Sequence, residues 1–344
     1  MFLAGIVILA SAGLSAALIL LLRPLLVRYA LARPNARSSH KVPTPQGGGI
    51  AVVAATLAVA APAVLAAGFP APGAIGEVAA VFLAAIVLAA LGAWDDLRPM
   101  PAAPRLAVQA AAVWIAVTAA RGDAALFGPL VPSWLETAVL VIAGVWFVNL
   151  TNFMDGIDWM TVANFVPMLA AVAAFAIVAA GSGRVPPVAA VAAALLGALL
   201  GFAPFNKPVA RLFLGDVGSL PIGLLVAWML YRLALDGALV AALILPLYYA
   251  ADATITLLRR LKRRERVWEA HRSHFYQQAT DNGFSVMAVA GHVLALNLAL
   301  AALAGAALVW RTLPMQLSAL ALGCVLTGLV LARFATPRRK RIAA

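Results

Sequence analysis

Residues 135–151 read LETAVLVIAGVWFVNLT, and apolar runs of similar length recur along the whole chain. A helix needs about 20 mostly apolar residues to cross the hydrocarbon core of a bilayer. Candidate segments of this kind lie at about 2–22, 48–67, 78–94, 106–120, 135–151, 161–180, 188–205, 218–235, 238–257, 286–309 and 315–334. We therefore predict an all-α integral membrane protein with about 11 transmembrane helices (10–11). Because the remaining loops are too short for a separate soluble domain, residues 1–344 form one polytopic domain.

The composition excludes two broad classes of protein. Of the 344 residues, 64% are hydrophobic and 11% are charged, whereas soluble proteins carry about 25% charged residues and disordered chains have low hydrophobicity. The single cysteine, Cys324, excludes an internal disulfide and a zinc site built from paired cysteines. A net charge of +12 would suggest nucleic acid for a soluble protein. Here the basic residues cluster in short loops between apolar runs, so we predict the lipid bilayer and no nucleic acid as partner.

Lys and Arg are distributed unevenly between the two sets of loops. If the N-terminus lies outside, 21 of the 25 fall on the cytoplasmic side. Cytoplasmic loops of membrane proteins carry such an excess. We therefore expect an outside N-terminus and a cytoplasmic C-terminus. No basic residue precedes the first apolar segment, so we interpret it as a retained helix and not as a removed signal peptide.

Most of the 13 acidic residues fall on the same predicted side. This group consists of Asp95, Asp96, Asp155, Asp158, Asp216, Asp252, Glu265, Glu269 and Asp281, and three of the four histidines, His40, His271 and His274, join it. Carboxylates, imidazoles and cations at one membrane surface are typical of an interfacial active site. A transporter would place its ionisable groups near the middle of the bilayer.

Two carboxylate motifs follow the third and fifth predicted helices. The first is AWDDLR at residues 93–98, where the adjacent Asp95 and Asp96 repel each other unless they share a cation or a proton. A solvated helix end with Arg98 as the local partner explains this motif equally well. The second is NLTNFMDGID at residues 149–158. Four polar groups directly after an apolar run favour a functional site over caps and turns alone.

A third motif, NKPVARLFLGDVGS at residues 206–219, opens the eighth predicted helix. Asp216 and Ser219 stand where a helix N-terminus favours anions and offers backbone N–H groups. An Asp/Ser cap with glycine turns explains the same pattern. The chain has no GxxxxGK[ST] motif, so this is not a P-loop.

Two further loops and one buried acid complete the set. HRSH at residues 271–274 suits phosphate oxygens better than a metal, because no third soft ligand stands nearby. HKVPTPQGGG at residues 40–49 combines stiffening prolines with glycines that permit close backbone approach. The basic run 259–266 is a topology signal that also attracts anionic lipid headgroups. Asp252 is unfavourable inside the ninth helix unless it is functional, and Arg259 is its nearest basic neighbour on the same face.

These five motifs, in this order from about His40 to Tyr276, closely resemble the polyprenyl-phosphate N-acetylhexosamine-1-phosphate transferases (glycosyltransferase 4 family), and most of all the O-antigen-initiating branch. The resemblance implies transfer of a HexNAc-1-phosphate from a UDP-sugar to undecaprenyl phosphate, with release of UMP, in the bacterial inner (cytoplasmic) membrane. It also implies Mg²⁺, with Mn²⁺ as an alternative, because a divalent cation neutralises phosphates that must approach each other. A homodimer is left open.

The resemblance also implies roles for individual residues. The metal is expected at Asp216, Asp96 and Asp155, with Asp216 as the direct ligand. Catalytic groups are expected at Asp95, Asp96, His271, Arg272 and His274, with Asp95 as base or orienter of the lipid phosphate. The nucleotide and sugar are expected at Lys41, Asn152, Asp155, Asp158, Asn206 and Phe213, with Phe213 stacking on uracil. These residues place the active site on cytoplasmic loops 23–47, 94–105, 152–161, 204–219 and 258–285.

The sequence departs from the family pattern at two places, which leaves the sugar open. Trp159 stands where many members have Gly, and HRSHFYQ replaces the HxHH of several branches. The phospho-N-acetylmuramoyl-pentapeptide transferase branch is the alternative within the family. A transporter or lipid flippase would need acids at mid-bilayer, where Asp252 is a partial candidate. A scaffold that recruits cytoplasmic enzymes would not need the carboxylate motifs.

Overall fold

The computed structural model describes residues 2–32, 43–66, 73–122, 124–128, 131–181, 185–266 and 271–337. Its helices are α1 (Phe2–Tyr29), α2 (Gly48–Ala66), α3 (Ala74–Leu97), α4 (Ala102–Arg121), α5 (Ser133–Phe153), α6 (Met160–Ala180), α7 (Pro187–Asn206), α8 (Asp216–Leu233), the π-helical turn η2 (Ala234–Ala238), α9 (Leu239–Ile244), α10 (Leu247–Lys262), α11 (Phe275–Asp281), α12 (Val286–Val309) and α13 (Leu313–Ala335). Two short strands, β1 (Leu31–Ala32) and β2 (Thr44–Pro45), pair antiparallel.

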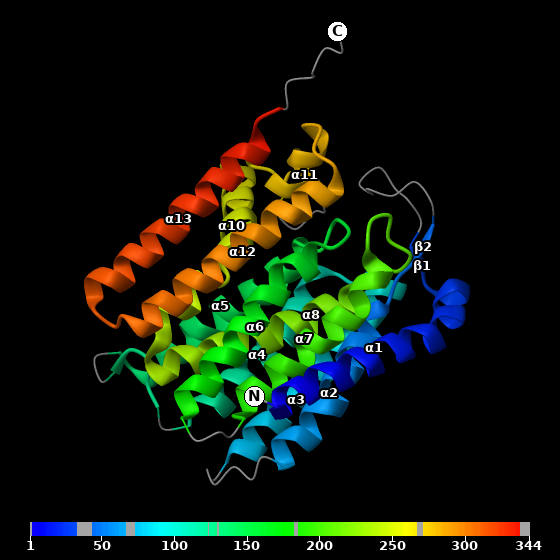
Figure 1. The fold of residues 1–344 in the computed structure, drawn as a ribbon. Coiled ribbons are helices and arrows are strands. Elements are labelled where there is room, and N and C mark those ends of the chain that lie inside the picture. The colour runs from blue at the N-terminus through cyan, green and yellow to red at the C-terminus, as the bar shows by residue number, and fades with distance from the viewer. Residues whose placement is uncertain are drawn as a thin grey trace.

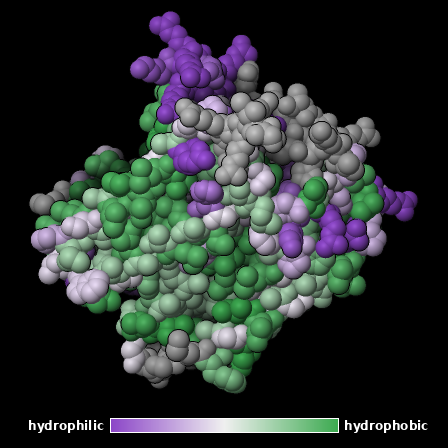
Figure 2. Space-filling view, turned by 45° about the horizontal axis from the view of Figure 1, so that its top comes forward, coloured by the Kyte–Doolittle hydropathy of each residue, from purple (hydrophilic) through white to green (hydrophobic). Residues whose placement is uncertain are grey.

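The long helices are those of a multi-pass membrane protein. Within the described residues, ten helical stretches are long and apolar enough to cross a membrane. Figure 2 shows a broad hydrophobic surface over the side of the bundle, with hydrophilic residues gathered toward its upper end. Large apolar side chains such as Leu9, Leu83, Ile142 and Leu329 are exposed on the outside of this bundle. The prediction of an all-α integral membrane protein is confirmed.

Helices α7 and α8 lie at the centre of the bundle (Figure 1). α7 packs against α1, α2 and α6, and α8 packs against α3 and α5. Two glycines of α7 allow a close approach to α1. A Cβ atom at Gly197 would lie 2.2 Å from the carbonyl oxygen of Ile8, and one at Gly201 would lie 2.3 Å from that of Ala12. Small residues at four-residue spacing let membrane helices approach backbone to backbone.

The prediction of one continuous ninth helix at 238–257 is wrong, because this segment is broken. It consists of α9 and α10, which are separated at Pro246, the residue before α10. Proline has no N–H and its ring clashes with the preceding helical turn. Gly237 between α8 and α9 has a left-handed backbone with φ 82°, so the chain also turns there. One of the ten apolar stretches, Asp216–Ile244, runs through this turn.

Contacts at the helix ends show which termini share one face of the bundle. The start of α8 contacts the end of α3, and Tyr249 of α10 donates a hydrogen bond to the carbonyl of Met154, just after α5 (3.4 Å). The chain therefore leaves this face along α8 and returns along α9 and α10. Asn282 after α11 bonds the carbonyl of Phe334 at the end of α13 (2.7 Å). That this face is the cytoplasmic one stays a prediction from the Lys and Arg distribution.

Candidate active site

Three glycines bring the ends of α2, α3 and α8 into backbone contact. A Cβ atom at Gly49 would lie 2.2 Å from the Cα atom of Gly218, and one at Gly92 would lie 2.3 Å from the backbone of Asp216. No side chain fits in either place. The glycine run before α2 therefore permits close backbone approach, as its sequence predicts. The amides of Gly48 and Gly49 donate to the carbonyls of Phe213 and Leu214 (2.9 and 2.8 Å), so this loop also anchors the segment before α8.

An acidic cluster, which we define as Asp96, Asn152, Asp155 and Asp216, lies where these helices converge. The Asp96 carboxylate accepts the N–H groups of Asp216 and Val217 (3.0 and 3.1 Å), which are the first two residues of α8. Asn152 at the end of α5 donates to Asp216 Oδ1 (2.7 Å) and to Ser219 Oγ (3.0 Å). The structure thus brings together three motifs that are far apart in the sequence.

Asp155 brings a further carboxylate into this cluster. Its side chain accepts a hydrogen bond from the hydroxyl of Thr161. Burial, as the largest cause, and the charges of Asp216, Asp158 and Asp96 raise the pKa of Asp155 to about 7, although the Thr161 hydrogen bond lowers it. Within the described residues, none of Asp96, Asp155 and Asp216 forms an ion pair. Neighbouring carboxylates without a cation repel each other.

Asp95 is held differently from Asp96. Its Oδ1 accepts the backbone N–H of Met100 (2.6 Å), and its Oδ2 pairs with the guanidinium of Arg105 (2.8 Å). Arg98, the local partner considered from the sequence, instead lies over the ring of Trp94 at 5.7 Å, so that expectation is wrong. Arg105 was missed because it lies ten residues downstream in α4, across the turn that joins α3 to α4.

The residues expected around the nucleotide are mostly engaged in fixing loops. Asp158 accepts the N–H of Ala210 (2.9 Å). Asn206 is buried, accepts the N–H of Trp159 (2.7 Å) and donates to the carbonyl of Leu212 (3.0 Å). These bonds tie the loop after α5 to the loop after α7. Phe213 lies on that second loop and is half-buried. Lys41 lies outside the described residues.

Trp159 occupies a backbone conformation that usually requires glycine. It is left-handed, with φ 64°, a region that disfavours residues with a Cβ atom. Its indole N–H donates to the carbonyl of Ala203 (2.7 Å), which holds the residue against α7. The departure from the family pattern therefore falls at a position where the backbone itself favours Gly.

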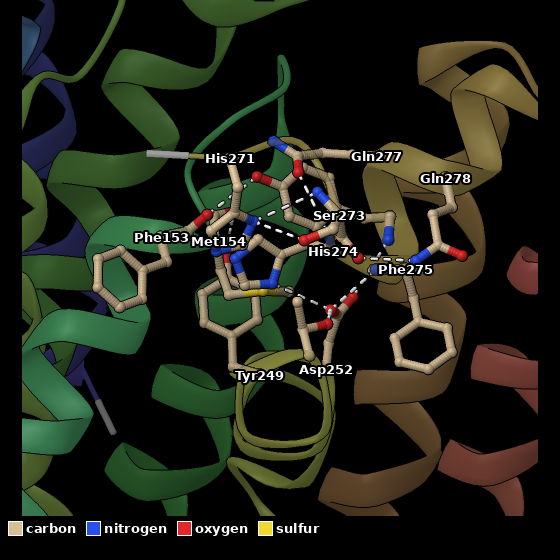
Figure 3. Close-up of polar contacts among 12 residues, drawn as sticks. Phe153, Met154, Tyr249, Asp252, His271, Ser273, His274, Phe275, Gln277 and Gln278 are labelled. Carbon is tan, nitrogen blue, oxygen red and sulfur yellow. Dashed lines mark hydrogen bonds and ion pairs between the residues drawn. The ribbon is translucent and has the colours of Figure 1, made fainter. Parts of the chain in front are cut away.

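The histidine loop, residues 271–274, lies over α10 (Figure 3). The rings of His271 and His274 are stacked, with centroids 4.7 Å apart, although His271 precedes the helix and the two do not share a helical face as considered from the sequence. His274 is buried and its Nδ1 lies 3.2 Å from Asp252. Arg272 pairs with Asp281 at the far end of α11 (3.2 Å).

Asp252 has a partner other than the expected one. Arg259 lies over the ring of Phe275 at 4.5 Å, and the described ion partner of Asp252 is His274. The pairing of Asp252 with Arg259 is therefore wrong, because residues 271–274 lie over the helix and place the imidazole of His274 at the carboxylate. Sequence spacing within one helix does not show such a return.

The acidic cluster fits a hard divalent cation. No group of three or more His, Cys, Asp or Glu side chains in the described part of the chain is arranged to hold a metal ion by itself. Mg²⁺ needs less, because it binds one or two carboxylates together with substrate phosphates and water. Oxygen donors from Asp216 and Asp155, without a cationic partner among the described residues, are the donor set that this ion prefers.

Comparison with known proteins finds one matching family model and relatives that are phosphosugar transferases. Residues 78–234 match the model of glycosyl transferase family 4. The chain is 32% identical over 243 residues to decaprenyl-phosphate N-acetylglucosaminephosphotransferase from Mycolicibacterium smegmatis, covering 63% of this chain and 58% of the relative. It is 24% identical over 281 residues to the probable undecaprenyl-phosphate N-acetylglucosaminyl 1-phosphate transferase of Bacillus subtilis, covering 78% and 75%. It is 30% identical over 155 residues to phospho-N-acetylmuramoyl-pentapeptide-transferase from Limosilactobacillus reuteri, covering 42% and 48%.

These matches agree with the resemblance drawn from the motifs. The fold agrees as well, since it is a helical membrane bundle with an acidic cluster at one end. Residues 78–234 match glycosyl transferase family 4, and the homologues of the chain are polyprenyl-phosphate N-acetylhexosamine-1-phosphate transferases. The match spans little more than half the length of the mycobacterial relatives. The family region, residues 78–234, contains the whole acidic cluster but not the histidine loop.

Proposed function

We propose that this protein transfers a HexNAc-1-phosphate from a UDP-sugar to undecaprenyl phosphate, releases UMP, and so starts a lipid-linked glycan at the bacterial inner membrane. An oxygen of the lipid phosphate attacks the phosphorus next to the sugar, and the bond from that phosphorus to UMP breaks. The observation that carries the proposal is the acidic cluster, in which carboxylates without ion partners among the described residues converge at the end of the bundle.

Each residue of the cluster has a role in this chemistry. When bound, Mg²⁺ would neutralise the charge on the phosphates that must approach each other. Asp216 and Asp155 would hold it, and Asn152 would orient Asp216 through its 2.7 Å hydrogen bond. Asp96 would position Asp216 without binding the metal itself, since both its oxygens hold the first turn of α8, which carries Asp216.

The lipid phosphate would enter beside Asp95 and Arg105. A phosphate monoester has a second pKa near 6, so it is largely a dianion near pH 7 and needs orientation more than proton removal. Arg105 pairs with Asp95 at 2.8 Å and provides the positive charge for that orientation. We therefore favour Asp95 as the residue that holds Arg105 in place over Asp95 as a general base.

His271 and Arg272 would meet the diphosphate of the UDP-sugar from the side opposite the cluster. The histidine loop is connected to the cluster, because Tyr276 donates its hydroxyl to the carbonyl of Phe153 (2.9 Å), two residues before Asp155. Imidazole and guanidinium donors suit phosphate oxygens. Phe213 is the candidate uracil stacker.

The acceptor and the donor sugar are the finer parts of the proposal. Relatives named for N-acetylglucosamine phosphate transfer align over 243 and 281 residues, and those named for phospho-N-acetylmuramoyl-pentapeptide transfer over 155. This difference favours a UDP-HexNAc donor over the muramoyl-pentapeptide alternative. A role in O-antigen and lipopolysaccharide synthesis is the pathway expected for such a donor.

The test is release of UMP by the purified protein in detergent. We expect release from at least one of a panel of UDP-HexNAc sugars that requires both undecaprenyl phosphate and Mg²⁺ or Mn²⁺, and that stops with EDTA. UDP-N-acetylmuramoyl-pentapeptide serves as the competing donor. Absence of release from every donor, with folded protein and either metal, would contradict the proposal.

A further inference from the structure

Asp252 is a buried carboxylate that the transfer reaction described above does not use. It lies in α10 with no exposed side-chain surface. An isolated carboxylate in such a place is strongly unfavourable, so its neighbours must satisfy it. Figure 3 shows two of these neighbours, His274 of the histidine loop and Phe275 at the start of α11, directly above it.

Five donors surround this carboxylate. Oδ1 accepts from the backbone N–H of Phe275 (3.0 Å), His274 Nδ1 (3.2 Å) and the Thr256 hydroxyl (3.4 Å). Oδ2 accepts from the backbone N–H of Tyr276 (3.1 Å) and the Tyr248 hydroxyl (3.3 Å). Backbone N–H groups can only donate. Both carboxylate oxygens therefore act as acceptors here.

The two backbone donors are the first residues of α11, whose N–H groups have no partner within the helix. Asp252 therefore fixes the start of α11 from a different helix. Tyr276, bound through its own N–H, extends its hydroxyl to the carbonyl of Phe153. A Cβ atom at Gly156 would lie 2.1 Å from that hydroxyl. One carboxylate thus sets the position of α11 against the loop that carries Asp155.

The same carboxylate determines the tautomer of His274. Because both oxygens of Asp252 accept backbone N–H groups, we assign the proton of the neutral His274 ring to Nδ1, from which it is donated to Asp252. His271 is the reverse case: the backbone N–H of Ser273 approaches its Nδ1 at 3.3 Å, so Nδ1 accepts and the neutral ring holds its proton on Nε2. The two stacked rings therefore differ in chemistry, and His274 is buried while His271 is partly exposed.

We propose that Asp252 is the positioning residue of the active site's histidine loop: it holds His274 as a buried donor and α11 in place, so that His271 alone of the two imidazoles meets the substrate. This inference rests on the proposed function and deepens it. His274 then acts through Asp252 and does not touch the reacting phosphates.

Two substitutions of His274 separate positioning from contact with substrate. The Nδ2 group of asparagine occupies the place of Nδ1 of histidine, so His274→Asn keeps the donor to Asp252 and removes Nε2. We expect His274→Asn to retain kcat within about fivefold of wild type. His274→Ala loses the donor, and we expect kcat to fall about 10²-fold, the scale of loss that misplaced groups produce. Equal loss in both variants would assign the function to Nε2 and overturn the proposal, as would normal turnover in His274→Ala.

A second variant tests the carboxylate itself. Asp252→Asn should lower kcat about 10²-fold and leave the KM for the UDP-sugar within about threefold, because the loop meets the phosphates in the transition state. Asp236→Asn is the matched control, since Asp236 lies in η2 and pairs with Arg232 at 3.9 Å, far along the chain from the loop. Unchanged turnover in Asp252→Asn overturns the proposal, and if that variant fails to fold, the His274 pair decides.

A readout without turnover separates this inference from the proposed function. The chain has four histidines, so ¹⁵N-imidazole NMR of the protein in detergent, assigned with His271→Gln and His274→Asn, resolves each tautomer. We expect an Nδ1-protonated signal for His274 that is lost in Asp252→Asn and kept in Asp236→Asn. If wild-type protein releases no UMP but shows this pattern, the proposed function fails and the positioning stands. A His274 signal that Asp252→Asn leaves unchanged contradicts the positioning.

Discussion

The acidic cluster differs in its partners from the carboxylates at the opposite end of the bundle. At the end opposite the acidic cluster, Glu77 accepts the indole N–H of Trp228 (2.8 Å) and lies 3.6 Å from the guanidinium of Arg232. Buried Glu136 accepts the N–H of Leu126 (2.9 Å). At the other end, Asp155 and Asp216 lie near each other and near Asp96, without ion pairs among the described residues. Removing one partner of a buried pair destabilises a fold, whereas buried carboxylates that raise one another's pKa values are typical of a functional site.

The largest effect should come from exchanging one carboxylate at each end. Asp216→Asn keeps the shape of the side chain and removes its charge, so UMP release should fall at least about 10²-fold, as when a catalytic electrostatic group is lost. Thermal stability in detergent should not fall. Glu77→Gln should do the reverse, with normal turnover and a lower melting temperature. Near-normal turnover in Asp216→Asn would remove the distinction between the two ends.

The next largest effect should come from a bulky side chain placed where α2 and α8 touch beside the cluster. Gly49→Val places side-chain atoms where the Cα atom of Gly218 lies, so α2 and α8 must separate. We expect a destabilisation of about 2 kcal/mol, in the range of overpacked cores, and loss of most activity. Gly291→Ala in α12 is the control, since nothing lies within 4 Å of its Cβ position. Equal melting temperatures for the two variants would refute the close packing.

A smaller effect concerns pH and Asp155. Its pKa is raised from 3.8 to about 7 by burial and neighbouring charge. Between these values the unfolded chain has released the proton that the folded protein retains, so ionisation of Asp155 lowers stability as pH rises toward 7, and the loss persists above. Asp155→Asn has no such proton. In EDTA, the melting temperature of Asp155→Asn minus that of wild type should increase by about 5 °C between pH 5 and pH 8.5. A constant difference would contradict the raised pKa.

The smallest effect on turnover should come from cysteine substitutions that allow the two ends to be labelled, because exposed positions tolerate substitution. In a Cys324→Ser background, Arg311→Cys and Arg263→Cys should both retain turnover. An impermeant thiol reagent should reach them from opposite sides of the membrane, with Arg263→Cys on the cytoplasmic side. Labelling of both from one side would contradict the topology predicted from the basic residues.

The sequence predicted the helices well because an apolar run of about 20 residues has few alternatives to a membrane helix. The resemblance of its motifs to the family also placed Asp96, Asp155 and Asp216 at one predicted metal site, whereas it placed Asn152 at the nucleotide. The sequence did not predict the break at Pro246, because other helices of the bundle continue through a proline, such as Pro62 in α2 and Pro167 in α6. Nor could it predict the pairs Asp95–Arg105 and Asp252–His274, which depend on how the chain turns between helices.

The central claim is that the acidic cluster holds a divalent cation and the opposite end does not. Mn²⁺ binding, followed by electron paramagnetic resonance in the presence of UDP, tests it without turnover. We expect one tightly bound Mn²⁺ per wild-type and Glu77→Gln chain, and none in Asp216→Asn. Equal Mn²⁺ binding by wild type and Asp216→Asn, or its loss in Glu77→Gln alone, would contradict the account.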